Sequence, residues 1–552
     1  MAAFWLGRSS ARETDQDCLH PRETQAGTLR NILIGAKGTA FAKDHGLTGS
    51  ETPVEFRRQV PIRDFEGLRP YVDRAAAGES RVLTREDPVY FARTSGTTAE
   101  PKMIPATAGS AASDARLMRQ WVHRARRDHP AFLARDIFTV VSPAVEEHTP
   151  SGIPIGSASG FVAKRIPALI RRSYAVPPAL ADIPEYHTRY LAMLRLGLER
   201  RISHLNTPNP STLLRLAELG AEHAEDILRA IRDGRLVPGY KGNAMPPGDG
   251  LRALEAKLRP NPARAAELEK LAAKRGRLAP RDGWPELALI ACWTGGSVGD
   301  TAARLPEWYG DAPIRDLGYI ASEGRFTIPA SDGTAAGIPA LADQFFEFVP
   351  EEDDGGEVLG IDELEQGARY RMLVTTSAGL YRYDIQDVVQ VDGFRSRSPL
   401  LAFSRKSRDM ANITGEKIHA NHVLAAMSAT AVPPGAKTRQ FRVAADPAQT
   451  RYRFYLELET GYAAGSGTWG PEWLRALDES LQQQNLEYRQ KRLSGRLRAP
   501  CLHVMASGWS ERMFRAWLGS GRKDAQYKWQ VLAQSPDTAF EKDILDTVET
   551  RP

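Results

Sequence analysis

The chain has 552 residues, more than a single hydrophobic core usually accommodates, so we expect two domains. Its composition, 42% hydrophobic and 26% charged, is ordinary for a globular protein and allows a sizeable core. A formal net charge of +5 is small for this length and argues against a polyanionic partner, so we expect no nucleic acid to bind.

Apolar spacing predicts the first elements of the chain. One helix is expected over residues 26–46, and a second, amphipathic helix over Asp114–Arg127. The β-branched run Ile137–Val141 predicts a short buried strand. From Ile183 to Leu278 the pattern is mainly helical, and Asn209-Pro210-Ser211 makes a good helix start there. The apolar residues that share the inner face of the first helix are Leu29, Ile32 and Leu33.

After this helical part the sequence pattern becomes typical of β-strands. Glu286–Trp293 and Ile314–Ile320 are buried-strand candidates, and the first ends in a glycine-rich turn. Tyr370–Thr376 and Leu380–Asp384, separated by a Ser-Ala-Gly turn, predict a hairpin. Arg451–Glu459 alternates as a half-buried strand does.

Strands mixed with long helical stretches favour an α/β fold. We expect a large N-terminal domain of β-sheets flanked by helices over residues 1–418. A smaller, mobile C-terminal α/β domain would follow over residues 419–552.

The cysteines Cys18, Cys292 and Cys501 are too sparse to indicate a disulfide framework or a paired-cysteine metal site. Together with the lack of a signal-peptide core or a membrane-spanning apolar run, they predict a cytoplasmic protein with no membrane partner. The oligomeric state is not indicated.

The segment Phe91–Pro105 crowds hydroxyl side chains and a glycine together, with Lys102 just downstream. Hydroxyls and successive backbone N–H groups can surround phosphate oxygens, the glycine permits close approach, and the lysine adds charge. The spacing is not that of a Walker A loop, and an ordinary polar turn is the alternative. The candidate phosphate-binding residues are Thr94, Ser95, Gly96, Thr97 and Thr98.

Two carboxylates in the strand-rich part are further candidates. Glu323 follows Tyr319 by four residues, a spacing that can stack a purine and hold a metal beside its phosphates. Asp387 lies between two strand candidates and can accept hydrogen bonds from both ribose hydroxyls, with Asp384 as its rival. A surface turn with a core tyrosine, and a helix cap or turn, are the respective alternatives.

Basic residues downstream complete the candidates. Arg405 and Lys417 could meet the ribose and the phosphates. Lys528 follows a glycine-rich bend in the C-terminal domain, from which domain closure could deliver it to an active site. Solvated surface charges are the alternative for each.

In this order the segments resemble the adenylate-forming superfamily of acyl-CoA synthetases, luciferases and peptide-synthetase adenylation domains. TSGTTAEPK resembles its phosphate loop, YIASE its adenine and magnesium segment, and YRYDIQD its ribose-binding segment. A narrower resemblance, to the Gretchen Hagen family of acyl acid–amido synthetases, covers most of the chain. It is carried by LRNILIGAKGTAFAKDHGL, VPIRDFEGLRPYVDRAAAGESRVLT, SGIPIGSASG and LAFSRKSRDMANITGEKIHANHV.

The resemblance implies ATP and Mg²⁺ and assigns roles to the candidates. The catalytic residues it implies are Lys102, Glu323, Lys417 and Lys528, with Glu323 as the metal ligand. The nucleotide-binding residues it implies are Thr94, Ser95, Gly96, Thr97, Thr98, Gly295, Gly296, Ser297, Tyr319, Ala321, Ser322, Asp387 and Arg405. Lys102 and Asp387 are expected in loops.

The sequence departs from the family at two positions. Gln386 stands where a glycine usually precedes the ribose aspartate, and Trp529-Gln530 replaces the Pro-Arg-like turn after the C-terminal lysine.

The expected reaction is adenylation of a small aryl or alkyl carboxylic acid followed by acyl transfer to an amine or amino acid. The alternatives are an acyl- or aryl-CoA ligase, which shares the first half-reaction, and a nucleotide-binding protein without catalysis.

Overall fold

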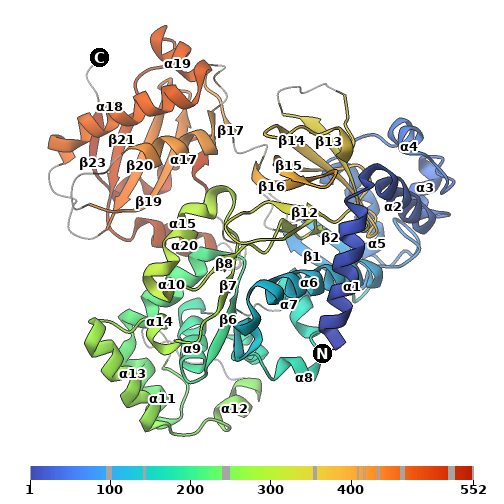
Figure 1. The fold of residues 1–552 in the computed structure, drawn as a ribbon. Coiled ribbons are helices and arrows are strands. Elements are labelled where there is room, and N and C mark those ends of the chain that lie inside the picture. The colour runs from blue at the N-terminus through green and yellow to red at the C-terminus, as the bar shows by residue number, and fades with distance from the viewer. Residues whose placement is uncertain are drawn as a thin grey trace. The chain divides into compact units, whose positions relative to one another are not determined.

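The fold was established from a computed structural model, which forms two compact units, Met1–Ser404 and Arg405–Pro552 (Figure 1). The structure describes residues 2–94, 102–140, 144–183, 185–238, 249–351, 357–406, 410–414, 416, 418–430, 432, 436–459, 466–519, 527 and 529–549. No helix within these ranges is both long enough and apolar enough to cross a bilayer.

The first unit combines helices and several sheets. Its α-helices are α1 (Ala2–Asp17), α2 (Pro21–Ala36), α3 (Ala40–Asp44), α4 (Pro53–Gln59), α5 (Phe65–Ala76), α6 (Ala108–Asp128), α7 (Ala158–Lys164), α8 (Ala168–Arg171), α9 (Tyr186–Leu198), α10 (Pro210–Glu222), α11 (Ala224–Asp233), α12 (Asp249–Glu255), α13 (Pro262–Arg275), α14 (Pro280–Gly283), α15 (Gly299–Ala303) and α16 (Leu305–Tyr309). Its short 3₁₀ helices are Pro130–Leu133, Pro178–Asp182, Gly296–Val298 and Ile361–Glu363.

The strands of this unit form three larger sheets and one small hairpin. One sheet has the order β2-β1-β5-β4, a second β3-β6-β7-β8 and a third β11-β12-β16-β15-β14-β13, while β9 pairs with β10. Their bounds are β1 (Tyr90–Thr94), β2 (Lys102–Ala106), β3 (Asp136–Thr139), β4 (Glu147–His148), β5 (Pro154–Gly156), β6 (Ile202–Asn206), β7 (Leu289–Ala291), β8 (Ile314–Arg315), β9 (Ile320–Ala321), β10 (Gly324–Arg325), β11 (Thr327–Pro329), β12 (Gly337–Pro339), β13 (Gln344–Pro350), β14 (Arg369–Thr376), β15 (Tyr383–Arg395) and β16 (Ser398–Lys406).

The six-stranded sheet confirms the predicted hairpin, because β14 pairs antiparallel with β15 across the turn at Gly379. Strand β13 continues the sheet beyond β14, and helix α2 packs against these two strands. Helix α5 packs against β2 and β15. The aromatic and aliphatic side chains enclosed here form the main core of the unit, which stabilises the sheet through burial of apolar area.

The four-stranded sheet β3-β6-β7-β8 is parallel throughout. One of its two central strands, β6, lies inside the stretch 183–278 that was expected to be mainly helical; helices α9 to α13 confirm that expectation, and this strand was missed. Four of its five residues are buried, because strands β3 and β7 border it on both edges and the 3₁₀ helix Pro130–Leu133 packs against it. Such a strand lacks the polar–apolar alternation by which a half-buried strand is recognised.

The helix expected over residues 26–46 is interrupted. Helix α2 ends at Ala36, Gly38 adopts φ +82°, and the Thr39 hydroxyl accepts the Ala42 N–H as the N-cap of α3. The glycine supplies a left-handed conformation that ends a helix, and the threonine begins the next one. The predicted inner face is confirmed, since Leu29, Ile32 and Leu33 are buried.

The second unit is a five-stranded mixed sheet of order β22-β19-β20-β21-β23 with helices α17 and α18 packed together against it (Figure 1). The alternating run at Arg451–Glu459 is confirmed as β20. Its elements are β17 (Met410–Ala411), β18 (Ile418–His419), α17 (Ala420–Ala429), β19 (Thr438–Asp446), β20 (Arg451–Leu458), α18 (Ser466–Gln484), α19 (Leu486–Leu493), β21 (Cys501–Met505), α20 (Trp509–Gly519), β22 (Leu532–Ala533), a 3₁₀ helix (Thr538–Asp543) and β23 (Ile544–Glu549).

Candidate active site

The hairpin of β1 and β2 positions the candidate phosphate loop. The two strands pair antiparallel, and Thr94 lies opposite Lys102 at the end of the ladder. The two described residues that flank the candidate phosphate loop are therefore adjacent in the sheet. Ser95, Gly96, Thr97 and Thr98 lie outside the described residues.

Lys102 is the first residue of β2, and not a loop residue as expected. Its Nζ donates a hydrogen bond of 3.3 Å to the hydroxyl oxygen of Tyr383, the first residue of β15. The ammonium also lies 5.8 Å from the centroids of the Phe65 and Tyr383 rings, within the range of a cation–π interaction.

Glu323 reaches the same tyrosine from a different element. It lies in the two-residue turn Ser322-Glu323 between β9 and β10, in which Ala321 pairs with Gly324. The Tyr383 hydroxyl lies 3.3 Å from Glu323 Oε1. The structure therefore brings two of the predicted residues, Lys102 and Glu323, to one phenol oxygen, although they are far apart in the sequence.

Tyr383 is fully buried, and its pKa is raised by burial and by the neighbouring charge of Glu323, so its hydroxyl stays protonated. An ammonium group can only donate, and a carboxylate can only accept. The phenol oxygen therefore accepts from Lys102 while its proton points to Glu323.

Asp387 lies within β15 and is 2% exposed, again not in a loop. It receives a hydrogen bond at Oδ2 from the hydroxyl of Tyr319. Burial and the charge of Asp387 raise the pKa of that phenol, which keeps it a donor. Asp387 is thus held in place by Tyr319, the aromatic residue predicted beside it in the site.

A β-bulge in β15 sets the direction of Asp387. Opposite Met372 and Leu373 the register jumps from Asp387 to Asp384, leaving two residues of β15 outside the ladder. One of them is Gln386, with φ +60°, in the left-handed region that favours glycine. The backbone conformation expected of the family's glycine is therefore present with glutamine in its place.

Asp384, the alternative candidate for binding the ribose, stabilises this bulge. Its Oδ1 accepts the backbone N–H of Gln386 at 2.8 Å, and its Oδ2 lies 3.4 Å from Arg371 Nη1. The side chain thus closes the bulge locally, as aspartate does in turns.

The ring of Tyr319 is only 6% exposed and packs between Phe326 and Phe403, with centroid distances of 5.0 and 5.5 Å. Tyr319 is thus packed in the core, as the alternative to a nucleotide role expected, and it also makes a polar contact to Asp387. The stacking of this ring on adenine stays a prediction.

The glycine turn after β7 lies close to β16. A Cβ on Gly296, which has φ +59°, would come within 3.1 Å of the Ser404 carbonyl oxygen. A Cβ on Gly295 would come within 2.7 Å of the Ala335 Cβ. Both positions therefore require glycine, which allows the turn to lie close to the strand. Nothing is described of the Ser297 side chain.

Asp316 joins this turn to the segment that carries Tyr319. Its buried carboxylate accepts the Thr294 N–H at 2.6 Å, the Thr294 hydroxyl at 2.9 Å and the Gly318 N–H at 2.6 Å. Burial raises its pKa, while these donors oppose the shift.

Sequence reasoning missed both Asp316 and Tyr383. An acidic residue inside the predicted buried strand Ile314–Ile320 was a usable indication of the first. The second had none, because a tyrosine at the start of a buried strand is typical of ordinary core packing.

The remaining predicted residues lie in the second unit or outside the description. Arg405 is 5% exposed, donates to the Lys406 carbonyl at 3.1 Å and lies 3.3 Å from His419 Nε2. Lys417 and Lys528 lie outside the described residues.

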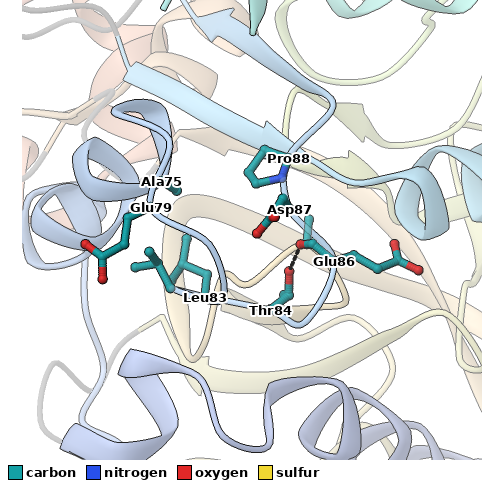
Figure 2. A pocket seen from close by; sticks show the side chains of 9 residues that line it. Ala75, Glu79, Leu83, Thr84, Glu86, Asp87 and Pro88 are labelled. Atoms are coloured by element: carbon teal, nitrogen blue, oxygen red, sulfur yellow. Dashed lines mark hydrogen bonds between the residues drawn. The ribbon is translucent and has the colours of Figure 1, made fainter. Parts of the chain in front are cut away.

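A separate small pocket of the first unit lies between α5 and the residues that follow it (Figure 2). Its polar groups hold the local chain together: the Thr84 hydroxyl donates to the Glu86 carbonyl at 2.5 Å, and Asp87 accepts from Ser80 and Arg81. None of the predicted site residues lines this pocket.

The two-unit α/β fold is similar to that of solved adenylate-forming enzymes. The structure is similar to that of 2-hydroxyisobutyryl-CoA ligase in its postadenylation state, with a TM-score of 0.51, 15% identity and coverage of 97% of this chain and 90% of that one. It is more similar to the GH3.15 acyl acid amido synthetase in complex with 2,4-DB, with a TM-score of 0.85, 19% identity and coverage of 99% and 98%.

The chain belongs to the GH3, or Gretchen Hagen, family. It matches the GH3 family N-terminal domain over residues 10–314, the central domain over 338–406 and the C-terminal domain over 421–537. It is 25% identical to the probable indole-3-acetic acid-amido synthetase GH3.1 of Oryza sativa subsp. japonica, covering 92% of this chain and 86% of that protein. It is also 25% identical to the jasmonoyl-L-amino acid synthetase JAR4 of Nicotiana attenuata, covering 71% and 70%.

Proposed function

We propose that this chain is an ATP-dependent ligase that joins a small carboxylic acid to an amine, in two steps. A carboxylate oxygen first attacks the α-phosphorus of ATP, which forms an acyl-adenylate and releases pyrophosphate. The amine nitrogen then attacks the acyl carbon and loses a proton, the bond to AMP breaks, and the amide is released. Neither step needs a covalent enzyme intermediate.

The match to all three GH3 domains in their family order carries this proposal. The named relatives are a probable indole-3-acetic acid-amido synthetase and a jasmonoyl-L-amino acid synthetase. We infer an aryl or alkyl carboxylic acid as the acyl substrate and an amino acid as the amine.

The first unit would bind the nucleotide. The loop between β1 and β2, from Thr94 to Thr98, would surround phosphate oxygens, and Lys102 would add positive charge at its end. Asp387 would accept the ribose hydroxyls, held in direction by Tyr319 and by the bulge at Gln386. The glycine turn at Gly295–Ser297 and the segment Ala321–Ser322 would line the same nucleotide.

The donor set at Glu323 fits Mg²⁺ bound together with ATP. Among the described residues no three carboxylate, histidine or cysteine side chains gather as metal ligands. Magnesium usually takes one or two carboxylates and completes its shell with water and substrate phosphates, so a single glutamate suffices. The ion would neutralise charge on the phosphates.

We propose that residues 419–552 act as the mobile C-terminal domain of the two-step cycle. Arg405 and Lys417, near the junction, and Lys528, within this domain, would address the ribose and phosphates in the orientation used for adenylation. Rotation of the domain would then admit the amine.

Trapping with hydroxylamine tests the first half-reaction directly. The full chain is incubated with ATP, Mg²⁺ and a panel of carboxylic acids, and acyl hydroxamate and pyrophosphate are measured, with Lys102→Met as control. We expect both products for at least one acid and their loss in the control. ATP binding without pyrophosphate release for any acid would instead support a nucleotide-binding protein without catalysis.

The acceptor is tested with the acid found in this way. Coenzyme A or a mixture of amino acids is added, and the product is identified by mass. An amide supports the proposed function. A thioester would establish the acyl-CoA ligase alternative.

A further inference from the structure

The two charged groups that contact the Tyr383 hydroxyl indicate a role for this tyrosine beyond the roles assigned above. Its hydroxyl oxygen lies 3.3 Å from the ammonium nitrogen of Lys102 and 3.3 Å from a carboxylate oxygen of Glu323. The cation and the anion therefore lie within two hydrogen-bond lengths of each other, and removal of that neutral oxygen would take away the group that both of them contact.

The position of the phenol is fixed by its backbone. Arg63 forms a parallel bridge to Tyr383: its N–H donates to the Arg382 carbonyl at 3.2 Å, and its carbonyl accepts the Asp384 N–H at 2.7 Å. Within the sheet, Tyr383 lies opposite Val374 of β14. Strand neighbours on both sides therefore hold the ring in place.

The residue before it is anchored as firmly. Arg382 adopts φ +44°, and its buried guanidinium bonds the carboxylate of Glu347 and the carbonyl oxygens of Arg57 and Val60. A non-glycine residue in this conformation needs surroundings that over-determine it, and such positions cluster at functional sites.

We propose that Tyr383 is a positioning residue that keeps Lys102 and Glu323 apart in the absence of nucleotide. The inference rests on the proposed function, in which Lys102 binds phosphate and Glu323 binds the metal ion. A direct ion pair between them would have to break before either could act. A neutral phenol holds both through weaker hydrogen bonds that exchange readily for the ligand.

The inference predicts coupling between Tyr383 and Glu323 in the binding of ATP without metal. The Kd of metal-free ATP is measured by calorimetry on the full chain for Tyr383→Phe, Glu323→Gln and the double variant. Tyr383→Phe removes one oxygen atom and should weaken ATP binding about tenfold, because Lys102 then pairs with Glu323. In the Glu323→Gln background the same change should weaken binding less than about threefold, since the Lys102–Glu323 ion pair cannot form there.

Tyr381 provides a matched control. It is equally buried, precedes Tyr383 by two residues, and donates its hydroxyl to the Leu83 carbonyl at 2.6 Å. Tyr381→Phe should lower the unfolding midpoint as much as Tyr383→Phe does, and should leave the Kd of ATP unchanged. It therefore corrects for the loss of a buried hydrogen bond as such.

The outcomes separate this inference from the proposed function. Equal losses in the two backgrounds, or an unchanged Kd in Tyr383→Phe, would overturn the positioning role while leaving ligase activity intact. A wild-type chain that binds ATP but forms no acyl hydroxamate would refute the ligase, and the coupling could still be measured.

Discussion

The buried carboxylate of Glu347 offers a sharp test of how the fold supports the site. Glu347 lies on β13, is 1% exposed, and accepts hydrogen bonds from Arg382 Nε at 3.0 and 3.2 Å and from Arg57 Nε at 3.0 Å. Glu347→Gln keeps the shape of the side chain and removes its charge. The Arg382 guanidinium would then be buried without a counter-charge.

Breaking a buried ion pair from one side costs about 3–5 kcal/mol. Glutamine retains one acceptor oxygen, and Arg382 keeps its bonds to two backbone carbonyls, so we expect the lower end, about 3 kcal/mol. Arg57 is 26% exposed, and Arg57→Gln leaves the Arg382–Glu347 pair intact. That control should therefore cost less than about 1 kcal/mol.

Urea unfolding of both variants, followed by circular dichroism, measures the difference in the free energy of unfolding. Because Arg382 directly precedes Tyr383, Glu347→Gln should also weaken ATP binding, whereas Arg57→Gln should not. A loss below 1 kcal/mol in Glu347→Gln, or equal losses in the two variants, would refute the reasoning.

Three further predictions concern other buried or strained residues. His204 of β6 is fully buried, stacks on Trp121, and burial lowers its pKa from 6.5 to about 3. The unfolded chain thus binds more protons between these values, so stability falls as pH drops from 6.5 towards 3, by about 2 kcal/mol at pH 5. His204→Leu should remove that share of the pH dependence in urea melts at pH 7.5 and 5, and an unchanged slope would contradict it. Gln386→Gly should leave the free energy of unfolding unchanged or raise it by up to about 1 kcal/mol, because the strain of the left-handed conformation disappears. A clear decrease in the free energy of unfolding would show that the glutamine side chain stabilises the fold. Asp387→Asn should raise the KM for ATP at least tenfold while the fold persists, and a wild-type KM would remove Asp387 from the ribose site.

Local sequence patterns predicted the helices and strands of this chain better than the tertiary contacts between them. The hairpin of β14 and β15 and the helix start at Asn209 follow from turn and capping residues, which act over a few positions. Strand β6 was missed because burial on both faces removes alternation. The helix break at Gly38 was missed because apolar spacing continues across it.

The site was predicted in part. Residue patterns and the motif resemblance nominated Lys102, Glu323 and Asp387, and the structure brings the first two to one phenol oxygen. That oxygen belongs to Tyr383, which no local pattern distinguishes from a core residue, because its partners come from remote strands and turns.

Gln386 illustrates the converse case. The sequence has glutamine where the family usually has glycine, which predicts that the left-handed backbone conformation is lost. The bulge of β15 nevertheless holds Gln386 at φ +60°. The cost of that conformation, about 1–2 kcal/mol, is small beside the packing of a strand in a six-stranded sheet, so the tertiary structure prevails.

The central claim is that the chain activates a carboxylic acid with ATP and passes the acyl group to an amine. Its most direct test is mass spectrometry of a reaction containing the purified chain, ATP, Mg²⁺, an acid selected by hydroxamate trapping and a mixture of amino acids. The account predicts an acyl–amino acid amide formed in equal amount to AMP. A thioester with added coenzyme A and no amide, or no AMP at all, would contradict it.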